Sequence, residues 1–516
     1  MCGIAGKTDW NGADSNRREV VRKMTGSLAH RGPDFEGVLD LDNISLGHRR
    51  LSIIDLSEKG NQPMTIPGGR YFVAYNGEVY NFPLLREMLE KEFGTGFFSH
   101  SDTEVILHCY ARYGVNCFEM FNGMFAIAIW DEEKKELILA RDRFGKKPLY
   151  YHVSGPGDVA FASELTSLML DSSVPKAISP EGINCFLALG YILSPMSLYR
   201  DVRKLEPASY IKFSKERAGT PVRYWSFAES FRAKTAESED EIAEHITELL
   251  SESVKRRMIS DVPVGAFLSG GIDSSSVVAL MKRFHTGELH TFSVGFQSES
   301  YNELPDAERI SSWIGTVHHS MICNKDNAID AVNESIDAFD EPFADNSLIP
   351  MVEVSGLASK YVKVVLSGDG ADEMFAGYIT YKADKYHAFA RPVPNSLKKL
   401  VSSLLSSSGN SKKLNWQYKQ RQFLNGAMHD ADRAHYMWRQ YFTPEERVAI
   451  LGRENEQLVF DTDPFRTFKK FYDNAYGLCA LDRNLYVDCM TWLPDDILVK
   501  VDRATMHWGL EARSPY

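Results

Sequence analysis

The rhythm of apolar segments changes once along this 516-residue chain, and that change limits the folds open to it. Up to about residue 207, short β-type runs are separated by turn signals such as Pro67-Gly68-Gly69, a pattern typical of an α+β unit with antiparallel strands. From about residue 262, apolar runs alternate with helical patterns, which predicts a parallel sheet flanked by helices. The predicted units are residues 1–207, a polar connection at 208–240, and residues 241–516.

Composition and charge exclude several classes of protein. Apolar residues make up 44% and charged residues 25%, as in ordinary globular proteins. The formal net charge of −12 provides no basic surface for nucleic acid or an anionic membrane. No run approaches the roughly 20 apolar residues of a membrane span, and no signal peptide is recognised. We therefore expect a cytoplasmic protein that binds small molecules. A homodimer is one oligomeric state that the sequence allows.

Cys2 follows the initiator methionine. Removal of that methionine would leave a thiol and a free α-amine on one residue. An α-amine with a pKa of about 7.7–8.0 can take the thiol proton near neutral pH, so the pair is a self-contained candidate nucleophile. The alternative is a small residue at this position without a catalytic role.

A second candidate site is a glycine loop. The loop Leu268-Ser269-Gly270-Gly271-Ile272-Asp273-Ser274 follows an apolar run and opens a helical run. The free N–H groups and the dipole of a helix N-terminus attract anions. Neither a Walker motif nor a G-x-G-x-x-G fingerprint is present. A phosphate-binding loop is predicted, and an ordinary turn capped by Ser274 or Ser275 is the alternative.

A third feature is an acidic loop, Ser367-Gly368-Asp369-Gly370, after the predicted strand 362–366. The two glycines let the backbone approach a ligand and turn back. Ligands of such sheets bind at the carboxyl ends of the strands. Asp369, the side chain between the glycines, is therefore predicted to point into the cleft.

Five blocks of the first unit resemble, in order and spacing, the signature blocks of class II glutamine amidotransferase domains. They are Met1-Cys2-Gly3-Ile4-Ala5-Gly6, His30-Arg31-Gly32-Pro33-Asp34, residues 48–55, Tyr75-Asn76-Gly77-Glu78 and Ser101-Asp102-Thr103-Glu104. The resemblance implies an Ntn-hydrolase-type sandwich in which Cys2 attacks the side-chain amide of glutamine. It also implies that Asn76 and the Gly77 N–H hold the oxyanion.

The same resemblance implies a glutamine pocket. Arg50 would pair with the α-carboxylate and Asp102 with the α-ammonium, chemistry that suits an arginine fork and an aspartate. Leu51, Ile53 and Glu78 would complete the pocket. Each residue taken alone has another explanation: Asn76-Gly77 is a good turn dipeptide, and Arg50 and Asp102 could be solvated surface charges.

The second unit contains four distinctive blocks, residues 268–275, 341–347, 366–373 and 498–503. They resemble ATP pyrophosphatases with a nucleotide α-hydrolase-like fold, so the whole chain resembles the glutamine-hydrolysing asparagine synthetase family. The resemblance implies ATP as co-substrate, bound by Leu268, Ser269, Gly270, Gly271, Asp273, Ser274, Val294, Ser367 and Gly368. Asp273 and Asp372 would hold Mg²⁺, which prefers carboxylates and phosphates. Lys500 would neutralise phosphate charge, and Asp369 would order or deprotonate ammonia.

The implied reaction joins glutamine hydrolysis to the formation of asparagine from aspartate and ATP, with AMP and pyrophosphate as products. Two rivals stay open. One is another carboxylate acceptor, because Asp369 stands where this family usually has glutamate. The other is a paralogue that binds glutamine or nucleotide without turnover. The chain ends at Tyr516, inside a block that usually continues in the family, which predicts a truncated second domain.

Overall fold

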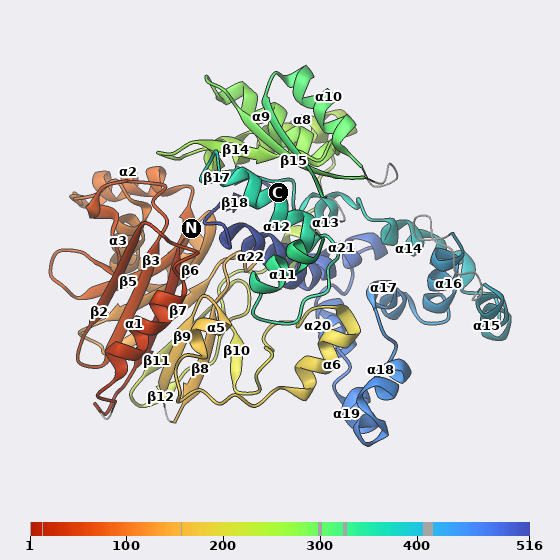
Figure 1. Ribbon diagram of the computed structural model, residues 1–516, viewed down its shortest axis with the longest axis horizontal. Coiled ribbons are helices and arrows are strands. Elements are labelled where there is room, and N and C mark those ends of the chain that lie inside the picture. The colour runs from red at the N-terminus through yellow and green to blue at the C-terminus, as the bar shows by residue number, and fades with distance from the viewer. Residues whose placement is uncertain (1, 13, 156, 298–301, 324–327, 406–415) are drawn as a thin grey trace.

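The computed structural model describes residues 2–12, 14–155, 157–297, 302–323, 328–405 and 416–516. Figure 1 shows the antiparallel strands of the N-terminal domain on one side and the short parallel sheet above the C-terminal helices. The labels of the two chain ends lie near the junction of these parts.

Two antiparallel sheets form the N-terminal domain. The first has the strand order β10 (Val202–Lys204), β8 (Tyr150–Ser154), β9 (Asp158–Ala162), β1 (Gly3–Thr8), β3 (Ile44–Arg50) and β2 (Phe35–Asp40). The second has the order β12 (Arg217–Ala218), β11 (Ser209–Ser214), β7 (Glu136–Arg141), β6 (Gly123–Asp131), β5 (Tyr71–Val79) and β4 (Met64–Thr65), with β13 (Val222–Arg223) paired to β11.

The two sheets pack face to face around one apolar core. Side chains of the first sheet, such as Leu46 and Phe161, meet Trp130 and Phe213 of the second. Helix α1 (Arg17–Ser27) covers the outer face of the first sheet, and α2 (Phe82–Phe93) and α3 (Asp102–Tyr113) cover the second. Strand β6 is buried on both faces for this reason, which explains its continuous apolar run.

This arrangement confirms the predicted α+β sandwich. Strand β11 pairs with β7 and also with the two short strands β12 and β13. The strand pairing of the first domain therefore extends to residue 223, past the predicted boundary at 207.

The second domain is built on five parallel strands, as predicted. Their order is β16 (Val317–Cys323), β15 (His290–Phe296), β14 (Val264–Phe267), β17 (Val364–Leu366) and β18 (Glu511–Arg513). Helices α8 (Glu239–Arg257), α9 (Ile272–Phe284) and α10 (Leu304–Ile314) cover one face. Helices α12 (Leu348–Ala358) and α22 (Leu498–Met506) cover the other.

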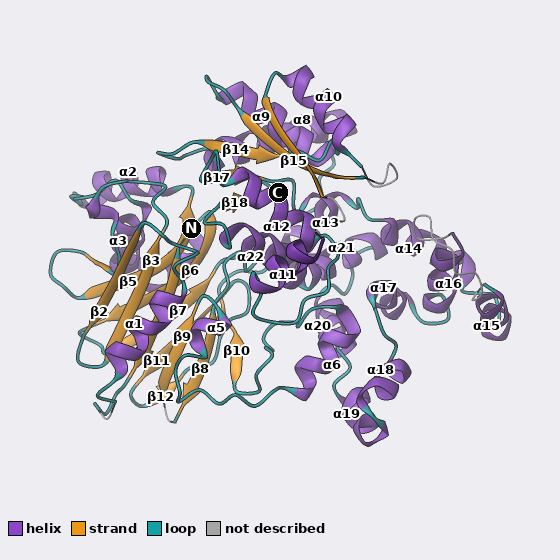
Figure 2. Cartoon of the chain, in the orientation of Figure 1, coloured by secondary structure: helices purple, strands orange, loops and turns teal. Residues whose placement is uncertain are grey.

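A group of helices follows β17 that the strand–helix pattern did not predict (Figure 2). It comprises α13 (Ala371–Phe375), α14 (Ile379–Ala390), α15 (Asn395–Leu404), α16 (Trp416–Gly426), α17 (Ala431–Arg439), α18 (Pro444–Leu451), α19 (Glu456–Asp461), α20 (Phe465–Asn474), α21 (Ala480–Met490) and the π-helix η6 (Leu493–Ile497). The remaining helices are α4 (Cys117–Met120), α5 (Leu165–Leu168), α6 (Pro180–Leu189), α7 (Ala228–Arg232), α11 (Ala328–Asp337) and the 3₁₀ turns η1 (Glu58–Gly60), η2 (Gly114–Asn116) and η5 (Arg453–Asn455). Within the described ranges, none of the helices is long and apolar enough to cross a membrane.

Candidate active sites

Cys2, directly before β1, lies against Asn76 within β5. The Cys2 backbone nitrogen donates to Asn76 Oδ1 at 3.0 Å. This nitrogen would become the α-amine if Met1 were removed. Asn76 Nδ2 is buried and has no hydrogen-bond partner in the part of the chain that the structure describes. A buried donor without a partner next to a thiol is suited to receive a developing oxyanion.

Gly77 is the residue after Asn76 on β5, and only glycine fits there. Its φ is +152°, and a Cβ at this position would lie 2.0 Å from the Met124 carbonyl oxygen of β6. The close approach keeps β5 paired with β6 through the site. Asn76-Gly77 is therefore part of a strand and not the turn that the dipeptide alone allows.

Several groups act on the thiol of Cys2. Burial raises the pKa of this thiol, while the Leu51 backbone N–H and the charge of Arg50 act in the opposite direction. The thiol therefore needs a base before it can attack an amide. Burial lowers the pKa of the buried His48 to about 3, which disfavours uptake of a proton by this side chain, and its Nε2 is 3.1 Å from the Tyr75 carbonyl oxygen.

Arg50 lies near Cys2 but its guanidinium is engaged by the loop that follows. Nη1 donates to the Ser57 carbonyl and to Asn61 Oδ1, both at 2.8 Å, and Nη2 donates to the Ile54 and Asp55 carbonyls. Arg50 thus fixes the wall of the predicted glutamine pocket. Its pairing with a glutamine carboxylate stays a proposal.

Asp102 and Glu78 form an acidic end of the same site. Asp102 accepts hydrogen bonds from the Tyr75 hydroxyl at 2.9 Å and the Val79 N–H at 3.0 Å. Burial raises the pKa of both carboxyls, and the charge of Asp102 adds to the shift at Glu78. The ammonium group of a substrate would stabilise these buried carboxyls in their charged form, which is consistent with the predicted role of Asp102.

The side chains of Leu51 and Ile53 lie at the boundary between the domains, and their role in the glutamine pocket stays a prediction. Both side chains are buried in a cluster with Val254 of α8 and Val264 of β14, which belong to the second domain. Their side chains therefore join the two domains. The Leu51 backbone N–H remains beside the Cys2 thiol.

The C-terminal strand reaches this first site, which sequence reasoning missed. Glu511 of β18 acts electrostatically on Cys2, and Arg513 Nη2 lies 3.5 Å from Glu78 Oε1. These residues are more than 400 positions from the blocks they meet. No local pattern could reveal that contact.

The glycine loop of the second domain joins β14 to α9 as predicted. Gly270 has φ +82°, and a Cβ there would lie 2.8 Å from Asp306 Cβ, so the turn requires glycine. Gly271 is the N-cap of α9 and makes no side-chain cap, although Ser269 and Ser274 hydrogen-bond each other at 3.0 Å. The first N–H groups of α9 are suited to bind phosphate.

A pocket of about 400 Å³ opens beside this loop. Predicted nucleotide residues Leu268, Ser269 and Val294 line it, together with Phe292 and Ser347. A volume of roughly 300–1,000 Å³ with mostly apolar walls is usual for a small-molecule site. The pocket is the candidate site for the nucleoside part of ATP.

The acidic loop lies against the glycine loop. A Cβ on Gly368 would be 2.9 Å from the Ser274 nitrogen, so the two backbones touch. Burial raises the pKa of Asp372, and the charges of Asp273 and Asp369 raise it further. The structure thus brings all three predicted carboxylates to one place, with Ser367 at the start of the loop.

Among the described residues, no group of three or more His, Cys, Asp or Glu side chains is placed to hold a metal ion. Asp273 and Asp372 are two neighbouring carboxylates beside a phosphate-binding loop. Mg²⁺ is commonly held by one or two carboxylates together with substrate phosphates, so these residues fit it.

Lys500 of α22 is buried beside the nucleotide pocket. Its Nζ donates to Asp345 Oδ2 at 2.6 Å and to Ser347 Oγ at 2.7 Å. Burial alone would lower its pKa, but Asp345 and Asp496 raise it. Lys500 therefore stays charged, with that charge partly compensated by Asp345. Asp496, which sequence reasoning did not select, has its pKa raised to about 8 by burial and by Asp345.

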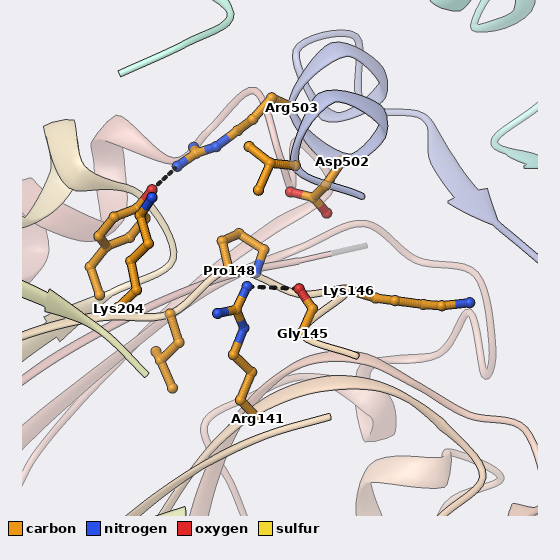
Figure 3. Close-up of a pocket in the computed structure, with 10 residues that line it drawn as sticks. Arg141, Gly145, Lys146, Pro148, Lys204, Asp502 and Arg503 are labelled. Atoms are coloured by element: carbon orange, nitrogen blue, oxygen red, sulfur yellow. Dashed lines mark hydrogen bonds between the residues drawn. The ribbon is translucent and has the colours of Figure 1, made fainter. Parts of the chain in front are cut away.

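A buried network of ion pairs joins the two domains. Asp502 of α22 binds Arg31 Nη2 at 2.9 Å and Lys147 Nζ at 3.1 Å, and all three side chains are at most 3% exposed. Arg31 Nε donates to the Cys2 carbonyl at 3.2 Å. Figure 3 shows Asp502 and Arg503 of α22 facing residues of the first domain across a small pocket.

Two family models match the chain: a glutamine amidotransferase domain over residues 1–225 and asparagine synthase over residues 245–516. Glutamine-hydrolyzing asparagine synthetase 1 of Bacillus subtilis is 33% identical over 524 residues, which cover 100% of this chain and 79% of that protein. A putative glutamine-hydrolyzing asparagine synthetase 2 of Methanocaldococcus jannaschii is 38% identical over 425 residues, 78% of this chain and 81% of that protein.

Another relative is the amidase chyE of Penicillium rubens, 32% identical over 410 residues, which cover 74% of this chain and 60% of that protein. The allosteric regulatory enzyme of purine biosynthesis, a solved structure, aligns with 62% of this chain and 80% of its own, at 18% identity and a TM-score of 0.34. That structural similarity is too low to support an argument by itself.

Proposed function

The chain belongs to the family of glutamine-hydrolysing asparagine synthetases, whose members make amides from glutamine and ATP, and on that premise we propose that it converts aspartate to asparagine. The proposal includes Mg²⁺ as the cofactor, residues 1–225 as the glutaminase domain and residues 245–516 as the synthetase domain. What supports it is one arrangement: a thiol beside an unpartnered amide donor in one domain, and a phosphate-binding loop beside three carboxylates in the other.

In the first half-reaction, the Cys2 thiolate attacks the side-chain carbonyl carbon of glutamine. Negative charge develops on the carbonyl oxygen, and Asn76 Nδ2 donates to it. Ammonia leaves with the proton that the base had taken from the thiol, and water then hydrolyses the thioester to glutamate. Asp102 and Arg50 hold the two ends of the substrate.

In the second half-reaction, a β-carboxylate oxygen of aspartate attacks the α-phosphorus of ATP and pyrophosphate leaves. Ammonia then attacks the acyl carbon, AMP leaves with the bond electrons, and Asp369 takes the proton. The N–H groups of α9 and the Gly270 turn hold the phosphates. Mg²⁺ at Asp273 and Asp372 would neutralise phosphate charge, and Lys500 would hold Asp345 and Ser347 beside the nucleotide.

A second candidate differs only in the acceptor. Asp369 is one methylene shorter than the glutamate expected from the family resemblance, and a relative carries the name of an amidase. A shorter carboxylate leaves room for a different acyl group near the acidic loop.

The test is a product assay with glutamine, Mg-ATP and a panel of carboxylic acids. We expect AMP and asparagine to form in equal amounts when aspartate is supplied. An amide formed only from another acid would support the second candidate. ADP and phosphate as products would contradict the proposed reaction on any acceptor.

A further inference from the structure

Lys146 lies in a rigid loop of the first domain that no step above uses. The carboxylate of Asp142 accepts N–H groups from Phe125, Phe144, Lys146 and Lys147, at 3.0 to 3.1 Å. This cap fixes the backbone from which the Lys146 side chain projects. In Figure 3 that side chain extends away from the pocket formed by Arg141, Pro148 and Asp502.

The tip of Lys146 holds the segment that follows β18. Its Nζ donates to the Ser514 carbonyl at 2.9 Å and to Ser514 Oγ at 2.8 Å. The carbonyl oxygen of Arg513, the preceding residue, accepts a hydrogen bond from the Ser367 N–H at 3.0 Å, and a Cβ on Gly370 would lie 3.4 Å from Tyr516 Cβ. Lys146 therefore supports the chain against which the acidic loop is packed.

The neighbouring Lys147 connects the same loop to Cys2. Lys147 binds Asp502, Asp502 binds Arg31, and Arg31 binds the Cys2 carbonyl. Two adjacent side chains of one rigid loop are thus connected to the two candidate sites, one through Ser514 and the other through Asp502 and Arg31. The loop is a common support for both.

The electrostatics of Lys146 favour a hydrogen-bonding role over a charge-pairing role. Its Nζ is bound to Ser514 and forms no ion pair with a carboxylate of the described residues. Burial lowers the pKa of Lys146 to about 7, and Arg257 and Lys147 act in the same direction, while Asp142 and Asp369 oppose it. A neutral amine still donates two hydrogen bonds, so the contact with Ser514 does not depend on the charge.

We propose that Lys146 is a positioning residue that holds residues 514–516 against the acidic loop and so keeps ammonia release at Cys2 coupled to its use beside Asp369. The proposal rests on the proposed function for its kinetic consequence. Its structural consequence is a fixed position of residues 511–516 and 367–373. That consequence can be measured whether or not the protein is active.

The test compares Lys146→Met with the unaltered full chain. Methionine keeps the length of the side chain, and its introduction breaks no ion pair, so the variant should fold. We expect the glutamate formed per amide to rise at least about three- to tenfold, because methionine removes both hydrogen bonds to Ser514 and the loss of one alone is worth about that factor. Ammonia-dependent synthesis and glutamine hydrolysis should each change by less than about twofold, because neither site loses a group.

Matched variants separate this role from a general loss of structure. Lys146→Arg keeps a donor and should restore part of the coupling, and Ser514→Ala should have a smaller effect because the carbonyl remains. Lys134→Met, on an exposed lysine, should leave the ratio unchanged. An unchanged ratio in Lys146→Met, or an equal fall of both activities at constant ratio, would overturn the proposal.

Hydrogen exchange on the full-length protein gives the second readout. We expect faster exchange in residues 511–516 and 367–373 of Lys146→Met than in the unaltered chain. Equal exchange would refute the support role even if the ratio changed. If the unaltered chain makes no amide with either nitrogen source, the proposed function fails, and the exchange comparison still decides the role of Lys146.

Discussion

Replacement of Asn76 tests the oxyanion site most directly, because the two ends of this side chain have separate tasks. Oδ1 accepts the Cys2 N–H at 3.0 Å, and the buried Nδ2 has no partner among the described residues. A buried donor left unpaired costs about 1–3 kcal/mol, which the developing oxyanion would recover. Asn76→Asp keeps the size and the Oδ1 acceptor but replaces the donor with an oxygen.

The magnitude follows from the one donor that is lost. Removal of an oxyanion donor costs about 2.7–4 kcal/mol, so Asn76→Asp should lower turnover of glutamine by at least about 10² to 10³, because the new carboxylate also repels the oxyanion. Asn76→Ala introduces no charge but loses the hydrogen bond from Cys2, which adds about 0.5–1.5 kcal/mol to the lost donor. The difference between the two variants therefore compares charge repulsion with the hydrogen bond that positions Cys2.

The assay measures glutamate released from glutamine and, in parallel, amide formed from ammonia and ATP. We expect the first activity to fall and the second to stay within about twofold, because Asn76 lies only in the first site. A loss of glutamine turnover smaller than about tenfold in Asn76→Asp would refute the assignment of Nδ2 as the donor.

Five further substitutions test the other site residues and one buried histidine. Cys2→Ala should abolish glutamine-dependent synthesis and leave ammonia-dependent synthesis, and equal loss of both would contradict separate sites. Asp273→Asn and Asp372→Asn should suppress formation of AMP and pyrophosphate while glutamate release continues, since each removes a carboxylate beside the phosphate loop. Asp369→Ala should lower amide formation by about 10²–10⁴ with ATP binding retained, and no effect would exclude it as the base. Burial alone would lower the pKa of His435, but Asp488 and Asp384 raise it to about 9, so its stabilisation is present below about pH 6.5 and is lost as the pH rises through about 9. Thermal unfolding midpoints should therefore fall over that range in the unaltered chain and less in His435→Gln, and identical slopes would contradict the assignment.

The sequence predicts the two domain classes because strand and helix periodicity are local properties. The glycine loop and the acidic loop are also local, and the structure has them where the pattern puts them, at the ends of β14 and β17. The glutamine-pocket role of Leu51 and Ile53 stays a prediction, while the packing of their side chains on the second domain was not predicted. A pattern that marks a residue as apolar does not state which apolar surface covers it.

The contacts of the C-terminal strand with the first site were not predicted, for a related reason. Glu511 and Arg513 reach the first site because β18 pairs with β17, a choice of sheet edge that no short motif encodes. The helices between residues 371 and 506 have readable helical periodicity, yet strand–helix alternation stops there. The expectation of a simple parallel-sheet domain therefore did not include the helices between residues 371 and 506.

The ion pairs of Asp502 restrict how this gene could be cut and recombined. A glutaminase domain taken alone would keep Lys147 without its carboxylate and leave Arg31 with Glu164 only. Where a new partner domain covers these groups without supplying a carboxylate, an uncompensated buried charge costs about 3–5 kcal/mol, a large share of the stability of a single domain. Transfer of this domain to another ATP-dependent partner should therefore yield folded chimeras only where the recipient supplies an acidic residue at the position of Asp502.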